Sequence, residues 1–251
     1  MTSALRIALV YPDLLGTYGD RGNALVLAHR ARSRGIAATV VEVAAGSPLP
    51  DSCDVYLLGG GEDAPQVAAA DGLANSRAAL GRALDAGAAL LAVCAGFQLI
   101  GHHYAAAGGR RMDGLGLVDL HTTAGPDRLI GEVLVAPDPA TGLPTITGFE
   151  NHGGRTHLGP GARPLGRVLH GGGNGDGTDG VLQGGLVGTY LHGPVLPRNP
   201  ALADHLLAHV TGTTLAPLEE PVVERYRAER LASASLTGSA RRRAERRLHR
   251  G

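Results

Sequence analysis

The sequence predicts an α/β fold in which a mostly parallel central sheet has helices on both faces and a β-rich second half follows. Three observations lead to this prediction. Short apolar runs alternate with segments of helical periodicity as far as Ala107. The apolar runs contain few polar positions, which is typical of parallel strands that are buried on both faces. From Gly109 onward, short strands alternate with turns rich in glycine and proline, which indicates a mixed or antiparallel sheet.

The first part of the chain is predicted to form strands and helices in turn. The strands are the apolar runs at 4–11, 37–43, 54–63 and 88–93, the third of which ends in three glycines. The helices have apolar side chains at helical spacing over 19–35, 64–86 and 96–107. Gly35 stands where a helix commonly has its C-cap glycine, and Gly72 marks a possible break in the second helix.

The second part of the chain is predicted to be mainly short strands. We expect them over 129–135, 145–151, 164–170, 179–183 and 185–193. The glycine-rich stretch 170–180 is expected to be an exposed loop, since a calcium-binding repeat would need more than one copy. A helix is expected over 199–210, with Asn199 as N-cap and Pro200 as its first residue, and a last helix over 221–236.

The length of 251 residues suits one α/β domain with additions. We expect this domain to span 1–212, and a C-terminal helix with a basic tail to occupy 213–251. The arginine-rich segment 241–250 is interpreted as a solvated or frayed helix end. Contact of this tail with an anionic surface is the alternative.

The composition excludes several classes of protein. The formal net charge is zero, which argues against nucleic-acid binding. No apolar stretch approaches the ~18 residues of a transmembrane helix, so the cytoplasm is the expected compartment. All 23 basic residues are arginine, and the absence of lysine excludes a Schiff base and a P-loop lysine. No cofactor is expected.

The chain has two cysteines, Cys53 and Cys94, which are too few for a disulfide framework. We interpret Cys53 as a packing residue, and a redox pair is not expected because the two lie on separate strands without C-x-x-C spacing. No metal site is predicted, since the histidines lack i, i+4 pairing with an acidic residue between them.

Cys94 follows a predicted buried strand and precedes a predicted helix. Such a junction presents its side chain at the carboxyl end of a parallel sheet, where α/β enzymes bind ligands. The amides at the start of the helix favour the thiolate form of cysteine. A cysteine nucleophile is therefore one interpretation, and an inert core cysteine is the other.

A cysteine nucleophile needs an oxyanion hole and a base. Gly60, within the glycines after the third strand, and Ala95 are the expected oxyanion donors through their N–H groups, although an ordinary tight turn is the plainer interpretation of the glycines. His192, just past a strong apolar strand, is the expected base, and His152 is the second candidate. His102 and its neighbour His103 are expected on the nucleophile's own helix, facing away from it.

Several quoted stretches resemble a known family. "AVCAGFQ" is similar to the G-x-C-x-G-x-Q elbow of class I, triad-type glutamine amidotransferases, "LLGGGED" to their oxyanion strand and "GTYLHGP" to their histidine strand. The motifs "YGDRGNALVL", "GFENHGGRT" and "GTYLHGPVLPRNP" narrow the resemblance to the cobyric-acid-synthase-like branch. Within that branch they resemble GatD, the glutaminase subunits of lipid II isoglutaminyl synthase. The resemblance implies a flavodoxin-like α/β fold.

The resemblance also implies an activity and a partner. The Cys94 thiolate would attack the side-chain amide of L-glutamine, and His192 would carry the proton to the departing ammonia. A MurT-type ATP-dependent ligase would use that ammonia to amidate the D-glutamate of the lipid II stem peptide, giving D-isoglutamine. Arg128 aligns with an arginine that holds the glutamine carboxylate. Gln98 either lines the same pocket or has a capping or packing role.

One departure from the family concerns the third catalytic group. Class I enzymes usually have His-x-Glu, whereas His192 is followed by Gly193 and Pro194. Proline cannot orient an imidazole, so the acid comes from elsewhere in the chain, from the partner subunit, or from nowhere. Two other functions remain open: a glutaminase that serves another acceptor, such as a corrinoid precursor, and a catalytically silent module that binds a partner.

Overall fold

The computed structural model describes residues 4–105 and 110–233, and a six-stranded sheet forms its centre. The strand order is β11-β12-β4-β3-β1-β2, and all neighbours are parallel except β11 and β12. The strands are β1 (Leu5–Val10), β2 (Ala38–Val43), β3 (Val55–Leu58), β4 (Ala89–Val93), β11 (Val181–Gln183) and β12 (Leu186–Thr189). Each residue of β3, β4 and β12 is buried, which explains their continuous apolar sequences.

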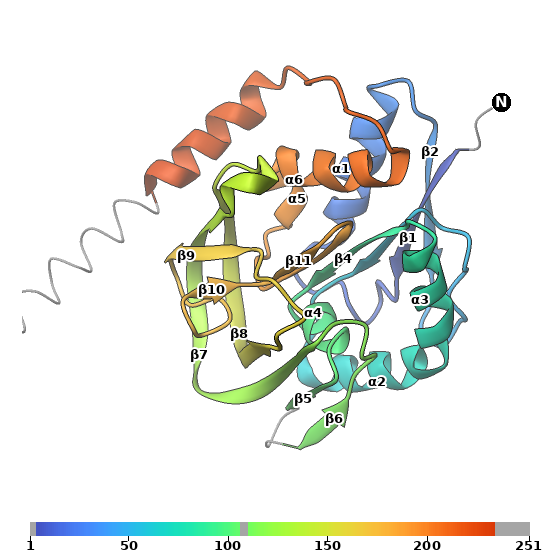
Figure 1. The fold of residues 1–251 in the computed structure, drawn as a ribbon, viewed down its shortest axis with the longest axis vertical. Coiled ribbons are helices and arrows are strands. Elements are labelled where there is room, and N and C mark those ends of the chain that lie inside the picture. Colours follow the sequence, from blue (N-terminus) through green and yellow to red (C-terminus); the bar gives the residue numbers. More distant parts are fainter. Residues whose placement is uncertain (1–3, 106–109, 234–251) are drawn as a thin grey trace, which may run out of the picture.

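Helices cover both faces of this sheet, as Figure 1 shows. They are α1 (Arg21–Arg32), α2 (Asp63–Leu73), η1 (Ala74–Ser76), α3 (Arg77–Asp85), α4 (Ala95–Leu99), α5 (Val195–Arg198) and α6 (Pro200–Thr211). Helices α1 and α6 pack against each other, and α4 packs behind the ends of β3, β4 and β12. A further helix spans 221–233. The break expected in the second helix is present, because α2 and α3 are separated by η1.

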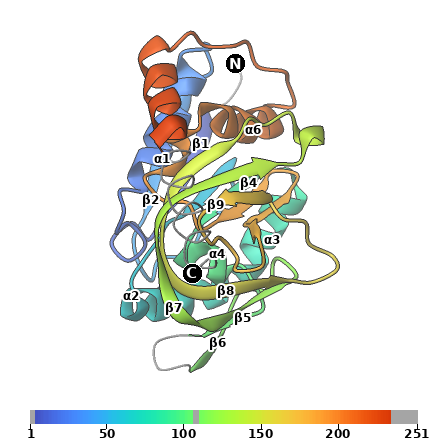
Figure 2. The ribbon, with the colours of Figure 1, turned by 90° about the vertical axis from the view of Figure 1, so that its left-hand side faces the viewer.

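The β-rich half forms a second sheet of order β10-β9-β7-β5-β6, with β8 paired to β7. Its strands are β5 (His103–Ala105), β6 (Arg111–Asp113), β7 (Leu120–Pro137), β8 (Ile146–Leu158), β9 (Gly166–His170) and β10 (Thr178–Asp179), with η3 (Pro139–Thr141) between β7 and β8. Figure 2 shows β7 and β8 as a long curved hairpin that wraps around the molecule. An isolated bridge joins Phe149 of β8 to His192, which ties this hairpin to the segment after β12.

The predicted helix over 96–107 is wrong beyond its first turn. Helix α4 ends at Leu99, and His103 begins strand β5. The reason is tertiary pairing: the N–H of His102 donates to the carbonyl of Leu120, which starts β7. A side chain at Gly101 would collide with Leu120, so this close approach depends on glycine. His102 and His103 therefore do not lie on the helix that follows Cys94.

Two further predictions need correction. Strands β7 and β8 extend well beyond the expected 129–135 and 145–151. The glycines and the proline that predict turns lie inside the paired strands instead. The strand pairing shifts register there, between Ala124 and Leu129. The stretch 170–180 is not simply an exposed loop. Asn174 and Asp179 are buried, and burial raises the pKa of the Asp179 carboxyl to about 7.

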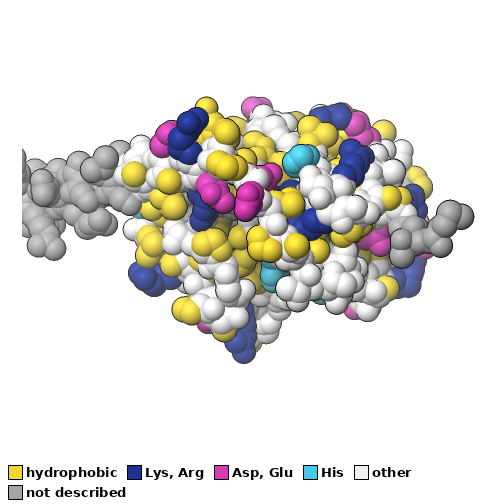
Figure 3. All heavy atoms as spheres, turned by 90° about the horizontal axis from the view of Figure 1, so that it is seen from above, with side chains coloured by type: hydrophobic (Ala, Val, Ile, Leu, Met, Phe, Trp, Pro, Cys, Tyr) yellow, Lys and Arg dark blue, Asp and Glu magenta, His cyan; other side chains and the backbone are white. Residues whose placement is uncertain are grey.

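The remaining expectations concern the surface and the C-terminal end. The face seen in Figure 3 has arginine and acidic side chains interspersed rather than gathered by sign. Within the described residues, no helix is long and apolar enough to cross a membrane. Cys53 is buried beside β3, as expected of a packing residue. The tail segment 241–250 lies outside the described residues, and the division into 1–212 and 213–251 stays a prediction.

Candidate active site

Cys94 lies at a tight turn between β4 and α4. Its backbone has φ of +50° and ψ of −101°, a conformation that side-chain-bearing residues rarely adopt. Its N–H donates to the carbonyl of Thr189 at 2.8 Å, which fixes the turn to the end of β12. Unusual backbone conformations of this kind are concentrated at active sites. Helix α4 has only five residues, so fewer aligned peptide dipoles act on the sulfur than the predicted longer helix would supply.

Two glycine-dependent contacts pack the turn against the end of β3. The N–H of Gly96 donates to the carbonyl of Gly59 at 3.1 Å. A Cβ at Gly96 would lie 2.5 Å from the carbonyl oxygen of Leu58, so only glycine permits this approach. The glycines after β3 therefore lie next to the cysteine turn, as the oxyanion prediction requires.

The Gly60 N–H has a partner that the sequence did not reveal. It donates to Oδ2 of Asp20 at 2.7 Å, and this carboxyl also accepts a hydrogen bond from Asn23. Asp20 is 2% exposed, and burial raises its pKa to about 6. The predicted oxyanion donor Gly60 is thus engaged by a buried acid in this structure. Ala95, the other predicted donor, is buried as the first residue of α4.

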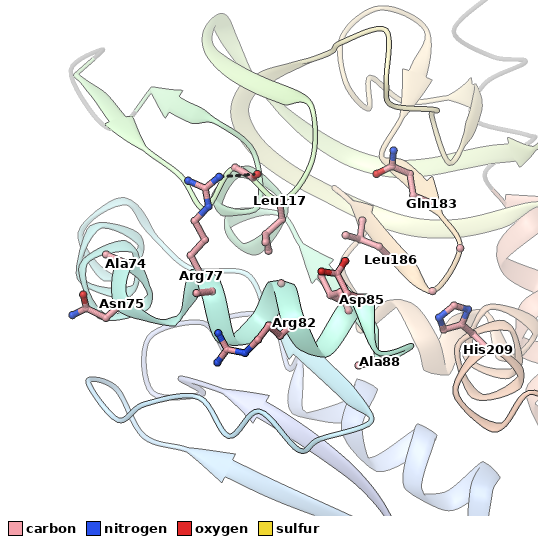
Figure 4. Close-up of a pocket in the computed structure, with 16 residues that line it drawn as sticks. Ala74, Asn75, Arg77, Arg82, Asp85, Ala88, Leu117, Gln183, Leu186 and His209 are labelled. Atoms are coloured by element: carbon pink, nitrogen blue, oxygen red, sulfur yellow. Dashed lines mark hydrogen bonds between the residues drawn. The ribbon is translucent and has the colours of Figure 1, made fainter.

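A pocket of about 500 Å³ opens at the cysteine. Its lining includes Cys94, Gln98, Arg128, Asn151 and His152. The structure thus brings together the predicted nucleophile and both predicted substrate-binding residues, which come from α4 and β7. Size alone would not have identified this pocket. A larger cavity of about 840 Å³ lies elsewhere, beside α3 (Figure 4), and is lined by neither cysteine.

Arg128 extends from the exposed part of β7 and is held by β8. Its Nε donates to Oδ1 of Asn151 at 2.5 Å, and its Nη2 donates to the Asn151 carbonyl at 3.2 Å. The guanidinium has further N–H groups beyond these two, which can point toward a ligand. An arginine fixed in this way suits recognition of a carboxylate in the pocket.

Gln98 lines the pocket, and both ends of its amide are hydrogen-bonded to other side chains. Its Oε1 accepts from Nε2 of Gln66 at 2.8 Å, and its Nε2 donates to the Tyr190 hydroxyl at 3.2 Å. Tyr190 is also hydrogen-bonded to Thr156, and burial raises its pKa to about 12. The contacts of Gln98 favour a packing role over direct substrate binding, although it borders the pocket.

His192 is buried and is not among the residues that line the pocket. Strands β4 and β12 are parallel neighbours, with Val93 paired to Thr189, so Cys94 and His192 leave the same edge of the sheet. His192 is 1% exposed, and neither ring nitrogen has a hydrogen-bond partner among the described residues. Burial lowers its pKa to about 3, with further lowering by the positive charges of His152 and Arg128.

His152 is held very differently. Its Nδ1 lies 3.0 Å from the Gly154 carbonyl and its Nε2 lies 3.3 Å from Oε2 of Glu150. Both ring nitrogens therefore have an oxygen atom at hydrogen-bonding distance. The carboxylate of Glu150 also accepts from two backbone amides at the start of the glycine-rich stretch, at 2.8 and 2.9 Å. The ring stacks on Tyr190 with centroids 3.6 Å apart.

Sequence reasoning missed four residues of this site: Tyr18, Asp20, Glu150 and Asn151. Their signal was present in the motifs "YGDRGNALVL" and "GFENHGGRT", which carried the resemblance but received no individual roles. Within the described residues, no cluster of histidine, cysteine and acidic side chains could hold a metal ion.

The chain matches a known protein family over most of its length. The model of the CobB/CobQ-like glutamine amidotransferase domain matches residues 6–200. Subunit GatD of the glutamine-hydrolysing lipid II isoglutaminyl synthase of Staphylococcus aureus is 39% identical, covering 78% of this chain and 79% of its own. The corresponding subunit of Streptococcus pneumoniae is 37% identical, covering 81% of this chain and 79% of its own.

Among solved structures, PurLQS from Thermotoga maritima has a TM-score of 0.53 over 84% of this chain and 99% of that chain. Its sequence is 16% identical, so this likeness concerns the fold alone. The expected class I amidotransferase fold is confirmed. By its family model and its relatives, the chain belongs to the CobB/CobQ-like glutamine amidotransferase family.

Proposed function

We propose that the chain is the glutaminase subunit of a lipid II isoglutaminyl synthase. The observation that carries this is Cys94, which lies at a strained strand-to-helix turn and borders a pocket with Arg128. Two relatives named as the GatD subunit of this enzyme match across most of both chains. The glutamine-hydrolysing activity in their names suits the nucleophile, the histidine and the arginine that this site contains.

The proposed reaction has two covalent stages. The Cys94 sulfur attacks the side-chain amide carbon of L-glutamine, and N–H donors such as that of Ala95 would stabilise the oxyanion. The C–N bond then breaks as His192 delivers the thiol proton to the leaving nitrogen, which releases ammonia. Water hydrolyses the glutamyl thioester, with its proton passing through His192, and yields glutamate. The neutral form of His192 that burial favours is the form that can accept the first proton.

Arg128 would bind the α-carboxylate of glutamine and so set the distance of the reacting amide from Cys94. Its anchoring on Asn151 supports this role because it fixes the guanidinium at the pocket. Gly60 becomes an oxyanion donor only if its N–H is released from Asp20. We therefore assign Ala95 the larger part of that stabilisation.

The ammonia would be used by a partner of the MurT type in the cytoplasm. That ligase would activate the α-carboxylate of the D-glutamate in the lipid II stem peptide with ATP, and ammonia would convert it to D-isoglutamine. The absence of lysine supports a separate synthetase, because this chain cannot contain a P-loop lysine. Purified chain alone is expected to show no ATP-dependent amidation.

The third catalytic group would come from this partner. Among the described residues no carboxylate is hydrogen-bonded or ion-paired to His192, and Pro194 occupies the usual acid position. An acid from the ligase would stabilise the imidazolium that forms during proton transfer. Glutaminase activity is therefore expected to be low for the isolated chain and to rise when the ligase binds. Equal turnover with and without the ligase would contradict a partner-supplied acid.

The function itself is tested by co-purification with a MurT-type ligase and an assay of lipid II amidation. Wild-type complex is expected to use either glutamine or free ammonia. The Cys94→Ala complex is expected to lose glutamine-driven amidation and to retain ammonia-driven amidation, which separates nitrogen supply from synthetase activity. Amidation of a corrinoid precursor instead of lipid II would support the alternative acceptor. Unchanged glutamine-driven amidation by Cys94→Ala would support a silent binding module.

A further inference from the structure

Hydrogen bonds do not explain how the imidazole ring of His192 is oriented. Its ring nitrogens have no partner among the described side chains and backbone, and the residues that follow it supply no acid. The ring is held by packing instead. A Cβ at Gly60 would lie 2.4 Å from Cε1 of His192, so the glycine backbone presses directly on one part of the ring.

Tyr18 supplies a second contact to the imidazole. Its ring centroid lies 4.3 Å from that of His192, with the two planes inclined by 46°. Tyr18 belongs to the segment between β1 and α1, far from His192 in sequence, and it is half-buried. Tilted aromatic contacts at this distance are attractive and favour a defined relative orientation. The imidazole is thus packed between a glycine backbone and a tyrosine ring.

The hydroxyl of Tyr18 connects this packing to the substrate side of the pocket. Nδ2 of Asn151 donates to the Tyr18 hydroxyl at 2.7 Å. Oδ1 of the same asparagine accepts from Nε of Arg128 at 2.5 Å. One amide therefore holds the tyrosine with its nitrogen and the arginine with its oxygen. Three segments meet at this point: the β1–α1 connection, β7 and β8.

We propose that Tyr18 is a positioning residue that orients His192 and, through Asn151, couples its placement to the glutamine-binding Arg128. Its ring holds the imidazole, and its hydroxyl holds the asparagine that fixes the arginine. Binding of the substrate carboxylate at Arg128 then stabilises the arrangement in which His192 faces the reaction. This inference rests on the proposed glutaminase function.

The two parts of Tyr18 can be separated by substitution. Tyr18→Phe keeps the ring but removes the hydroxyl, so kcat should stay within about threefold while KM for glutamine rises about fivefold to tenfold. Tyr18→Leu removes the ring as well, and kcat should fall by on the order of 30-fold to 100-fold, because small misplacement of a catalytic group has effects of that size. The measurement is steady-state glutaminase kinetics of the complex with its ligase.

Tyr226→Phe is the matched control, since Tyr226 is an exposed tyrosine on the helix 221–233, outside the catalytic pocket. It should leave kcat and KM unchanged. A double substitution, Tyr18→Phe with Asn151→Ala, should raise KM no further than Asn151→Ala alone, because both remove the same connection.

The outcomes distinguish failure of the proposed glutaminase function from failure of the positioning role of Tyr18. If wild-type complex hydrolyses no glutamine, the proposed function fails. If wild type is active and Tyr18→Leu retains kcat, the positioning role is overturned. If Tyr18→Phe loses kcat as severely as Tyr18→Leu, or if both lose activity only in proportion to a loss of folded protein, the ring is not what orients His192.

Discussion

The two buried histidines of the site, His152 and His192, differ in almost every contact. The two ring nitrogens of His152 lie at hydrogen-bonding distance from the Gly154 carbonyl and the Glu150 carboxyl, and a tyrosine stacks on its ring. His192 has no hydrogen bond at either nitrogen within the described structure and is held by packing against Tyr18 and Gly60. His152 also lines the pocket, whereas His192 is not among its lining residues.

The two rings therefore differ in whether their nitrogens are already engaged by neighbouring groups. The ring of His152 is tied to its surroundings through both nitrogens, which lie at hydrogen-bonding distance from Gly154 and Glu150. The ring of His192 is kept neutral by burial and has both nitrogens unengaged, so it retains a lone pair for a proton, and its low pKa would make that proton easy to pass on. His152 lies two residues from Glu150, so proximity to a carboxylate in the sequence would by itself favour it as the candidate base. The contacts in the structure favour His192 for that role. The predictions below test this contrast.

The largest expected effect is at the nucleophile. Cys94→Ala should lower glutaminase kcat by on the order of 10⁴-fold or more, since losing a covalent nucleophile removes the main reaction path. Cys53→Ala is the matched control, because Cys53 is a buried cysteine just before β3 and is not among the residues that line the catalytic pocket. Assay of both variants with the ligase present measures this. Comparable losses in the two variants would refute a specific role for Cys94.

The next effect separates the histidines by activity. His192→Gln should lower kcat by about 10²-fold to 10⁴-fold, the usual contribution of general acid–base catalysis. Its free energy of unfolding should fall by about 1–3 kcal/mol, because the buried ring packs against Tyr18 and Gly60 and the amide that replaces it does not reproduce these contacts. Kinetics paired with thermal unfolding checks both statements. A variant that keeps near wild-type kcat would transfer the role of base to His152.

The third effect separates the histidines by stability. Glu150→Gln keeps the shape of the side chain but removes the charge that faces His152 and the two backbone amides. The free energy of unfolding should fall by about 1–3 kcal/mol, as expected when buried hydrogen-bonding groups lose a charged partner. Denaturant titration measures the change. An unaltered unfolding midpoint would show that the His152–Glu150 pair is not a structural anchor.

A smaller effect is the pH dependence of stability. Burial lowers the pKa of His192 to about 3, below the ordinary histidine value. Between that pKa and about 6.5, the unfolded chain binds a proton that the folded chain excludes, so His192 favours unfolding as pH falls. Wild type should therefore lose up to about 1.4 kcal/mol per pH unit relative to His192→Gln below pH 6.5.

The difference between wild type and His192→Gln isolates the contribution of His192 from that of two other buried groups. Asp20 and Asp179 have raised pKa values of about 6 and about 7, so their protonation opposes the effect of His192. Both carboxyls are present in wild type and in the variant, and their contributions largely cancel. Parallel pH profiles for the two proteins would show that the folded state protonates His192 normally.

Much of the parallel sheet could be predicted from the sequence, because its strands are continuously apolar and are separated by periodic helices. The strands of the β-rich second half were harder to predict from the sequence. Strands β7 and β8 contain glycines and a proline whose local sequence predicts turns. The strands remain paired because the register shifts at this point. The helix after Cys94 was overextended because a backbone pairing with β7 outweighs local helical propensity.

The site was predictable only in part for the same reason. Cys94 was predicted from its strand-to-helix position, and Arg128 and Gln98 from a resemblance; the three line one pocket. Tyr18 and Asp20 act on His192 and Gly60 through contacts between segments that lie far apart in the chain, and no local pattern encodes such contacts. The role of the glycine-rich stretch in holding Glu150 was hidden in the same way.

The central claim is that Cys94 is the nucleophile that reacts with the glutamine side chain. The most direct measurement is mass spectrometry of the complex after incubation with a diazo-ketone analogue of glutamine. We predict one covalent adduct that maps to the peptide containing Cys94, is absent from Cys94→Ala and is prevented by excess glutamine. An adduct on Cys53, or glutamine hydrolysis that persists in Cys94→Ala, would contradict the account.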